Sequence, residues 1–425
     1  MTHATRVPLH PGRPRLLALV ATLGLVPALL ATSACGGPAA AADRNDLTVL
    51  TFAPSGTGAS DRPGMTALAD AIGKQLNTRG GAAGHKLKVL TCNEHNTAEG
   101  AADCAHQAVS AGAVAVIGSY SQFGDSFMPV LEAARIPYIG GYGLSGPEFT
   151  SPLSYPVAGG TPALIAGSGR QLVAAGCRTV AVIRPDTPAG DTLLGSLAGA
   201  LNPAGIKLVD VRAPEKSTDY TPQAKAAIGD DRPNNCVTDA LGPVPTLNLL
   251  DALRRLPHKN TKLASVIGSF QQSVVDSTGG DSGPLGGAYA TGWFPPEGSK
   301  VWDGLRDTVR GSGAGEVPID DSDPGVQTTW VAYQVFLKAV EQLGTGEVTT
   351  QSLRTLLDSG DRFDTGGATP PLSWGLTSML ASADSPRLVN TSVTFQQVQG
   401  GRLVEQQPGF VDVRWVLTGG KPPAS

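Results

Sequence analysis

The chain has 425 residues with 32 Lys and Arg against 36 Asp and Glu, a formal net charge of −4 at pH 7. This mildly acidic balance argues against nucleic acid as a partner. The length exceeds what one ordinary hydrophobic core accommodates, so we expect two domains. Apolar runs recur almost to the C-terminus, which argues against extensive disorder.

The first 34 residues have the pattern of a bacterial signal peptide. Arg6, Arg13 and Arg15 precede an apolar run over 16–31, and small residues follow it. The run is shorter than the roughly 20 residues that a membrane-spanning helix needs. We therefore expect the signal to be cleaved and the mature chain to begin at Cys35.

The residues before Cys35 resemble a bacterial lipobox. Ser33 and Ala34 fit that motif, whereas Thr32 departs from its usual leucine. The resemblance implies that the Cys35 thiol receives diacylglycerol and anchors the protein to the outer face of the cell membrane. Ordinary signal cleavage is the alternative. We interpret residues 35–46 as the lipidated cysteine and a flexible tether.

The remaining chain alternates short β-rich apolar runs with helical stretches, which is typical of parallel βαβ units. In a first series we expect strands at 47–52, 87–91, 113–117 and 137–139, with helices at 65–77, 98–111 and 127–134. In a second series we expect strands at 179–183, 207–211, 237–241, 263–267 and 287–293, with helices at 162–175, 222–229 and 247–256. Two similar lobes would join near 155–160.

The rhythm changes after Trp293, because Pro295 and Pro296 interrupt the run. A long helix at 326–343 has no obvious strand partner, so the chain should cross back to the first lobe. Alternation over 393–404 around Gly400 and Gly401 predicts a β-hairpin. We expect the first lobe to hold 47–157 plus about 296–374, the second 158–295 plus about 375–415, and a tail at 416–425.

Several strings stand at the ends of these expected elements: residues 50–56 (LTFAPSG), 114–121 (VAVIGSYS), 135–139 (RIPYI), 218–221 (TDYT), 366–374 (GGATPPLSW) and 395–402 (FQQVQGGR). In these strings and their order the chain resembles the solute-binding proteins of the leucine/isoleucine/valine-binding family over about residues 47–407. The resemblance implies a type I periplasmic binding protein fold, which is α/β with two doubly wound Rossmann-like lobes joined by a three-segment hinge. It also implies a non-enzymatic protein that captures a small-molecule ligand for an ABC permease. We expect a monomer without cofactor or metal.

Ligands of open α/β sheets bind beyond the carboxyl ends of the strands, where the loops of both lobes would converge. These loops predict ligand contacts from Ser55, Gly56, Ser119, Tyr120, Ser121, Gly141, Tyr142, Asp186, Thr187, Gly242, Ser269, Phe270 and Gln271. Their side chains indicate a neutral polar pocket. Ser121 matches the family position whose hydroxyl meets a ligand carboxylate. The same residue types are favoured in turns and at helix N-caps whatever the function.

The chain departs from the amino-acid binders at two positions of this predicted pocket. Those proteins usually place a threonine where this chain has residues 140–145, and an acidic residue where it has 269–272. Burying an ammonium group without a carboxylate costs several kcal/mol. We therefore expect a small polar or amphipathic ligand rather than a simple α-amino acid.

Four further cysteines in an exported chain predict two disulfides, Cys92–Cys104 and Cys177–Cys236. The first pair brackets a loop and the next helix start. The second pair precedes two strands that should be neighbours.

A zinc site is the alternative for the first cysteine pair, since His95 and His106 lie close to it in the sequence. Cys104 and His106 would be two apart on a helix and would point in different directions. We therefore favour the disulfide.

Two strings allow a rival interpretation as an exported hydrolase. Residues 280–284 (GDSGP) resemble a protease nucleophile loop, and residues 364–366 (DTG) resemble half of an aspartic protease site. A serine nucleophile needs a nearby base, and we expect His85, His95, His106 and His258 in loops or helix ends at the wrong edge of the sheets. The second aspartate motif is missing. Both strings are therefore interpreted as turns, while a ligand-sensing lipoprotein without a transport role stays open.

Overall fold

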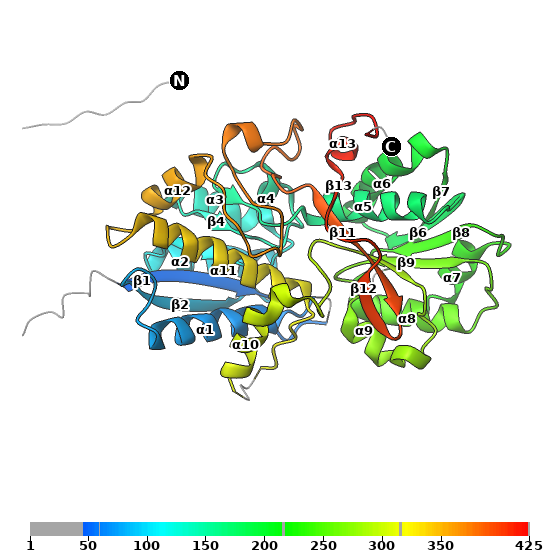
Figure 1. Cartoon of the computed structure of the whole chain (residues 1–425), viewed down its shortest axis with the longest axis horizontal. Coiled ribbons are helices and arrows are strands. Elements are labelled where there is room, and N and C mark those ends of the chain that lie inside the picture. The colour runs from blue at the N-terminus through cyan, green and yellow to red at the C-terminus, as the bar shows by residue number, and fades with distance from the viewer. Residues whose placement is uncertain (1–45, 59, 215–216, 314–316, 424–425) are drawn as a thin grey trace, which may run out of the picture. The chain divides into compact units, whose positions relative to one another are not determined.

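The computed structural model of the protein describes residues 46–58, 60–214, 217–313 and 317–423 (Figure 1). In these residues the chain forms two β-sheets with helices on both faces of each. The expected signal peptide, Cys35, residues 36–45 of the tether and the last two residues of the tail lie outside the described residues. No helix of the described part is long and apolar enough to cross a membrane.

The first sheet is wholly parallel, in the order β2-β1-β3-β4-β5. Its strands are β1 (Asp46–Ala53), β2 (Lys86–Asn93), β3 (Ala115–Ile117), β4 (Tyr138–Ile139) and β5 (Ser154–Tyr155). The four predicted strands of the first series are confirmed. Strand β5 is absent from the predicted elements, because two residues are too few to give a periodic pattern.

Helices pack on both faces of the first sheet, which explains why its strands are apolar along their whole length. Leu47 and Val49 of β1 belong to one buried cluster with residues of α1 and α11, whereas Leu50 and Phe52 belong to a second with α2 and α3. The helices associated with this sheet are α1 (Pro63–Thr78), α2 (Ala98–Ser110), α3 (Gly124–Ala134), α4 (Gly146–Thr150), α10 (Asp303–Gly311), α11 (Pro324–Leu343) and α12 (Thr350–Asp358).

The second sheet has the order β12-β11-β10-β9-β8-β6-β7, and β13 pairs with β11. Strands β6 to β10 are parallel, and β11 runs antiparallel to β10 and β12. The strands are β6 (Thr179–Pro185), β7 (Lys207–Ala213), β8 (Asn235–Asp239), β9 (Lys262–Val266), β10 (Tyr289–Gly292), β11 (Ser392–Gln399), β12 (Arg402–Glu405) and β13 (Val411–Asp412). The predicted second series and the C-terminal hairpin are confirmed.

The helices of the second sheet also cover two faces, as Figure 1 shows. They are α5 (Gly160–Ala174), α6 (Pro188–Leu201), α7 (Thr221–Ile228), α8 (Pro243–Arg254), α9 (Gln272–Ser277) and α13 (Arg414–Leu417). Helices α5 and α6 pack closely, since a Cβ at Gly169 would come within 2.6 Å of Ala200. Single 3-10 turns lie at η1 (Asn202–Ala204), η2 (Gly280–Ser282), η3 (Lys300–Trp302) and η4 (Leu376–Ser378).

Three chain segments connect the two sheets, and side-chain donors tie them together. The first runs from β5 to α5, the second follows β10, and the third precedes β11. Trp374 Nε1 donates to the carbonyl of Pro156 at 3.1 Å, and Asn390 Nδ2 donates to that of Val157 at 3.0 Å. Trp293 Nε1 donates to the carbonyl of Gly160 at 2.9 Å. The second and third segments therefore bond to the backbone of the first.

Both predicted disulfides are present in the structure. Cys92 of β2 joins Cys104 of α2 with a Cα–Cα distance of 5.6 Å, and Cys177 joins Cys236 of β8 at 5.9 Å. The second bond links neighbouring strands, because β6 pairs with β8. The thiols of the alternative zinc site are joined to each other and are not free to bind a metal as thiolates.

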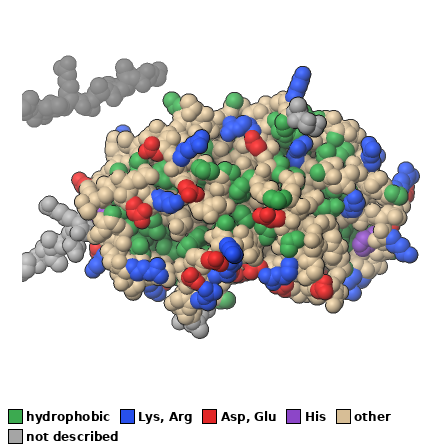
Figure 2. Space-filling model, in the orientation of Figure 1, with side chains coloured by type: hydrophobic (Ala, Val, Ile, Leu, Met, Phe, Trp, Pro, Cys, Tyr) green, Lys and Arg blue, Asp and Glu red, His purple; other side chains and the backbone are tan. Residues whose placement is uncertain are grey.

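Lys and Arg side chains are interspersed with Asp and Glu over the face that Figure 2 shows. Most ion pairs of the described residues are exposed, such as Arg254–Asp251 and Arg310–Asp307. Such pairs contribute little to stability. The exceptions are three buried arginines that pair with acids across longer sequence distances, namely Arg62, Arg184 and Arg387.

Candidate ligand site

An aromatic cluster lies where loops of the two sheets meet. Tyr120 follows β3 and Tyr142 follows β4, and their ring centroids are 4.8 Å apart. Tyr142 also contacts Trp293, which follows β10 of the second sheet, at 4.9 Å between centroids. The two tyrosines are 5% exposed and Trp293 is 1% exposed. All three follow the carboxyl ends of parallel strands, the edge where ligands of such sheets bind.

The guanidinium of Arg62 lies over both tyrosine rings of this cluster. Its central carbon is 5.7 Å from the centroid of Tyr120 and 5.6 Å from that of Tyr142. Arg62 is the N-cap residue of α1, where Pro63 at the first helical position favours the helix start. Stacked cation–π contacts of this kind stabilise a desolvated cation by about 2 kcal/mol.

Arg62 forms a buried ion pair with Asp323. Asp323 is the N-cap residue of α11 and accepts from the backbone N–H groups of Gly325 at 2.7 Å and Val326 at 3.1 Å. Burial acts to lower the pKa of Arg62, but Asp323 and the two tyrosines outweigh it and hold that pKa above its ordinary value. The sequence predicted a neutral polar pocket, and that prediction is incomplete, because this charged pair lies among its aromatic residues.

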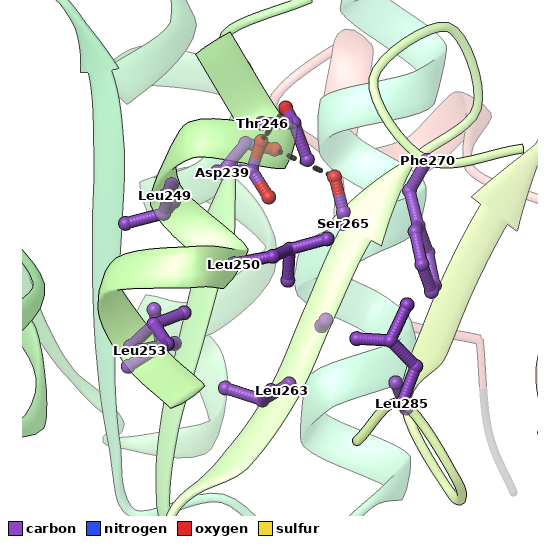
Figure 3. Close-up of a pocket in the computed structure, with 12 residues that line it drawn as sticks. Asp239, Thr246, Leu249, Leu250, Leu253, Leu263, Ser265, Phe270 and Leu285 are labelled. Carbon is purple, nitrogen blue, oxygen red and sulfur yellow. Dashed lines mark hydrogen bonds between the residues drawn. The ribbon is translucent and has the colours of Figure 1, made fainter. Parts of the chain in front are cut away.

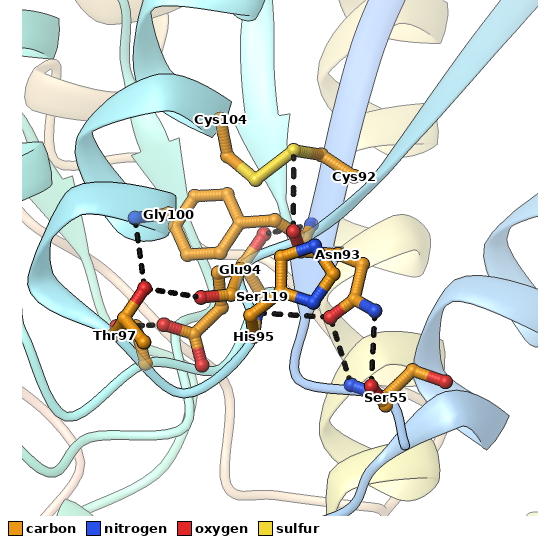
Figure 4. The surroundings of a disulfide bond; sticks show 11 residues. Ser55, Cys92, Asn93, Glu94, His95, Thr97, Gly100, Cys104 and Ser119 are labelled. Atoms are coloured by element: carbon orange, nitrogen blue, oxygen red, sulfur yellow. Dashed lines mark hydrogen bonds between the residues drawn. A yellow bond between two sulfur atoms is a disulfide. The ribbon is translucent and has the colours of Figure 1, made fainter. Parts of the chain in front are cut away.

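A second buried acid, Glu94, directly follows β2 (Figure 4). Ser121 Oγ donates to Glu94 Oε2 at 3.0 Å and accepts from the backbone N–H of Phe123 at 3.0 Å. The hydroxyl hydrogen of Ser121 is thus committed to Glu94 while that carboxylate is ionised. Burial raises the pKa of Glu94 to about 6, and the hydrogen bond from Ser121 only partly offsets this rise.

Gly141 allows the chain to turn closely over a third buried acid. A Cβ at Gly141 would come within 2.3 Å of Glu148 Oε2 and 2.2 Å of the Tyr138 ring. Glu148 accepts from the backbone N–H groups of Gly143, Leu144 and Ser145. Its hydrogen bonds are satisfied by the loop that carries Tyr142, so Glu148 holds that loop in place.

Comparison with known proteins identifies the family. The model of the family described as periplasmic binding protein matches residues 49–401. The chain belongs to the periplasmic binding protein family. A comparison with curated protein sequences gives no match.

Solved structures of periplasmic binding proteins share the fold at low sequence identity. A possible leucine/isoleucine/valine-binding protein from Rhodopirellula baltica SH 1 has a TM-score of 0.70 at 15% identity, over 86% of this chain and 97% of that chain. A fatty acid ABC transporter substrate-binding protein from Thermomonospora curvata has 0.71 at 14%, over 87% and 94%. A solute-binding protein of an ABC transporter from R. palustris, solved with benzoate, has 0.66 at 13%, over 86% and 98%. The predicted type I fold is thereby confirmed.

The binding protein brings some of the predicted contact residues together. The rings of Tyr120 and Tyr142 contact each other with their planes tilted by 59°, and Ser121 follows Tyr120 directly. A Cβ at Gly268, one residue before the predicted Ser269, would come within 2.7 Å of Tyr142 Oη. The loop after β9, which also carries Gln271, therefore reaches the aromatic cluster.

Other predicted residues have structural partners instead. Ser119 Oγ accepts from Phe52 N at 3.0 Å, and Ser269 Oγ accepts from Gly242 N at 3.0 Å. Asn93 clamps the backbone of Ser55, and Gly56 N donates to Asp61. Asp186 pairs with the exposed Arg212, and Thr187 caps α6. Phe270 lies in the core of the second lobe.

The two hydrolase-like strings form turns, as predicted. Residues 280–282 make the 3-10 turn η2, and Asp364 Oδ1 accepts from Gly366 N at 3.0 Å in a local turn. The expected position of His95 is wrong, since it follows β2 at the carboxyl edge. It is exposed there, while His106 lies within α2.

Arg62, Asp323 and Glu94 are functional candidates that the sequence patterns did not predict. Arg62 and Asp323 each directly precede a proline that begins a helix. That pattern is the signal that could have placed both at the carboxyl edge of the sheet. Nothing in the sequence distinguishes Glu94 from an exposed acid.

Proposed function

We propose that this periplasmic binding protein captures a small polar or amphipathic molecule between its two lobes and delivers it to an ABC importer. The observation that carries the proposal is the aromatic cluster of Tyr120, Tyr142 and Trp293, to which both sheets contribute. A ligand bound there would be enclosed by rings from both sides. Concave sites with few polar groups and many aromatic walls are typical of small-molecule binding.

The proposed role is binding without catalysis. The hydrolase-like strings form turns. The buried acids near the cluster, Glu94 and Glu148, accept hydrogen bonds from neighbouring hydroxyl and backbone N–H groups. The family implies an extracytoplasmic location. We further propose that lipidated Cys35 holds the protein on the outer face of the cell membrane, where an ABC permease can accept the solute.

A thermal-shift screen of the detergent-solubilised full-length chain tests the capture of a solute. The solutes are amino acids, amides, aromatic acids, nucleosides and peptides. A ligand at 100 times its dissociation constant adds about 2.7 kcal/mol of stability, which gives a measurable shift. A screen without any shift would contradict the proposal.

The position of the site is tested with Tyr142→Leu, which removes ring contacts to both Tyr120 and Trp293. We expect the affinity for a hit from the screen to fall at least about 10-fold, in line with an interface aromatic residue. Tyr289→Leu is the matched control, because Tyr289 begins β10 at the opposite end from Trp293. Equal affinities of the two variants would place the ligand elsewhere.

A further inference from the structure

A small pocket lies between α11 and the second sheet, beside the aromatic cluster. Four glutamines contribute to its wall, namely Gln271, Gln272, Gln327 and Gln396, and Phe294 and Pro295 supply an apolar side. Gln271 comes from the loop after β9, Gln327 from α11 and Gln396 from β11. The lining therefore combines a helix packed on the first sheet with strands and loops of the second.

Three of the four glutamines have their amide groups engaged by the protein. Gln272 donates to Gly401 O at 3.0 Å and accepts from Leu403 N at 2.9 Å. Gln327 Nε2 donates to Asp321 O at 3.0 Å, and Gln396 Nε2 donates to Phe294 O at 2.9 Å. These bonds fix the wall of the pocket.

Gln271 differs from the other three. Its Nε2 donates to Ser273 Oγ at 3.0 Å, but its buried Oε1 has no hydrogen-bond partner among the described residues. The side chain is 6% exposed. A buried acceptor without a partner destabilises the folded protein, and a donor that reached it would recover that free energy.

The charges around the pocket favour a neutral donor. Among the described lining residues the one ionisable side chain is Glu297, which pairs with Arg402 at 3.2 Å. A ligand carboxylate would meet no lysine or arginine in this wall and would face the acceptor oxygen of Gln271. An ammonium would meet a carboxylate already neutralised by its partner.

The lining of the pocket adjoins the aromatic cluster, since Phe294 contacts the Trp293 ring at 6.3 Å between centroids and two loops contribute to both. Ser322 contributes to its lining and directly precedes Asp323, the partner of Arg62. The loop that carries Gln271 begins at Gly268, which lies against Tyr142. A molecule enclosed by the tyrosines could therefore extend one end into the pocket.

We propose that this pocket receives a neutral hydrogen-bond donor of the solute, a carboxamide or hydroxyl group, and that Gln271 Oε1 accepts its hydrogen. The proposal rests on the proposed function and narrows the class of solute. The pocket is small, so the terminal group alone enters it, beside Phe294 and Pro295, and the apolar part of the solute packs against the aromatic cluster.

Four probes that share one ring test the choice of head group. Benzamide, benzyl alcohol, benzoate and benzylamine are titrated into the detergent-solubilised full-length chain by calorimetry. We expect benzamide or benzyl alcohol to bind at least about 5-fold more tightly than the two charged probes, as one additional neutral hydrogen bond predicts. A preference for benzoate or benzylamine, or no response to any probe, would overturn the proposal.

Variants of Gln271 test the acceptor itself. Gln271→Met keeps the length of the side chain without an acceptor and should lower the affinity for the preferred neutral probe about 5-fold. Gln271→Glu supplies an anion at the same place and should shift the preference to benzylamine, an exchange that loss of folding could not produce. Gln399→Met on the exposed end of β11 is the control and should bind as wild type.

The outcomes separate this inference from the proposed function. If the wider solute screen gives a hit but both Gln271 variants keep the wild-type order of the four probes, the pocket proposal fails and the binding function stands. If the screen gives no hit at all, the binding function fails as well.

Discussion

At the scale of single residues, two buried carboxyl groups stand out, one in each sheet. Glu94 is fully buried at the end of β2, and Asp239 ends β8 with an exposed fraction of 4%. Asp239 lines an apolar pocket of the second lobe and accepts from Thr246 Oγ1 at 2.6 Å (Figure 3). Burial raises the pKa of Asp239 to about 6, as it does for Glu94.

These two acids predict that stability falls as pH rises from 4 to 7. Both protonate more readily in the folded state than in the unfolded chain, so the folded protein binds more protons in this range. For Glu94, the rise of the pKa from 4.5 to about 6 corresponds to about 2 kcal/mol in the free energy of unfolding. This contribution is present at low pH and is lost by pH 7. Urea unfolding at several pH values measures this loss.

Glu94→Gln and Asp239→Asn should each flatten that pH dependence, since the amides do not titrate. Glu132→Gln, on the exposed side of α3, is the control and should keep the wild-type slope. Equal slopes in wild type, both variants and the control would contradict the assignment.

Single-residue patterns predicted part of the candidate site. Tyr120 and Tyr142 could be placed at the carboxyl edge of the first sheet, because each follows a strand that was predicted from a β-rich apolar run. The pairing of Arg62 with Asp323 could not, because 261 residues separate them and the contact depends on α1 and α11 packing side by side. The helix starts were predicted at residues 65 and 326, two residues after the observed starts at Pro63 and Pro324. The N-cap residues Arg62 and Asp323 were therefore not included in the predicted site.

At the scale of elements, the positions of the strands along the chain were predictable because parallel strands buried on both faces are continuous apolar runs. Helix α6 is absent from the predicted elements. It contains Gly190, Gly195 and Gly199, and glycine weakens a helical pattern. Tertiary packing stabilises this helix despite its low intrinsic propensity. It packs closely on α13, since a Cβ at Gly199 would come within 3.1 Å of Val416.

The two disulfides should differ in their contribution to stability. Their cysteines are 12 and 59 residues apart in the sequence. In the chain-entropy description, closing the shorter loop stabilises by about 3 kcal/mol and the longer by about 4 kcal/mol. Replacing Cys177 and Cys236 together by Ala should therefore lower the free energy of unfolding more than replacing Cys92 and Cys104.

Urea denaturation of both double variants, without reductant, measures the difference between the disulfides. Wild type treated with reductant gives the combined loss as a reference. A larger loss in the Cys92/Cys104 variant would contradict the loop-length argument and would point to the role of that bond in holding the loop around Glu94.

At the scale of the whole molecule, the segments that connect the two sheets and the candidate site share Trp293. Trp293 donates to the first connecting segment at Gly160 and presents its ring to Tyr142. A ligand that separates these rings would act directly on the segment that joins the sheets. We therefore expect occupation of the candidate site and closure of the lobes to be coupled through Trp293.

The proposed attachment of the protein to a membrane depends on Cys35, which precedes the described residues. Each buried methylene of an acyl chain contributes about 0.8 kcal/mol, so a single chain holds a protein weakly and several hold it firmly. We expect the intact mass of the detergent-extracted protein to lack residues 1–34 and to include a diacylglyceryl group and a further acyl chain on Cys35. Cys35→Ala should lack this added mass, whereas Ser33→Ala, which keeps a small residue in the motif, should retain it. A wild-type protein cleaved elsewhere, or cleaved before an unmodified Cys35, would contradict the lipid anchor while leaving the solute site unaffected, since the site lies wholly within residues 46–423.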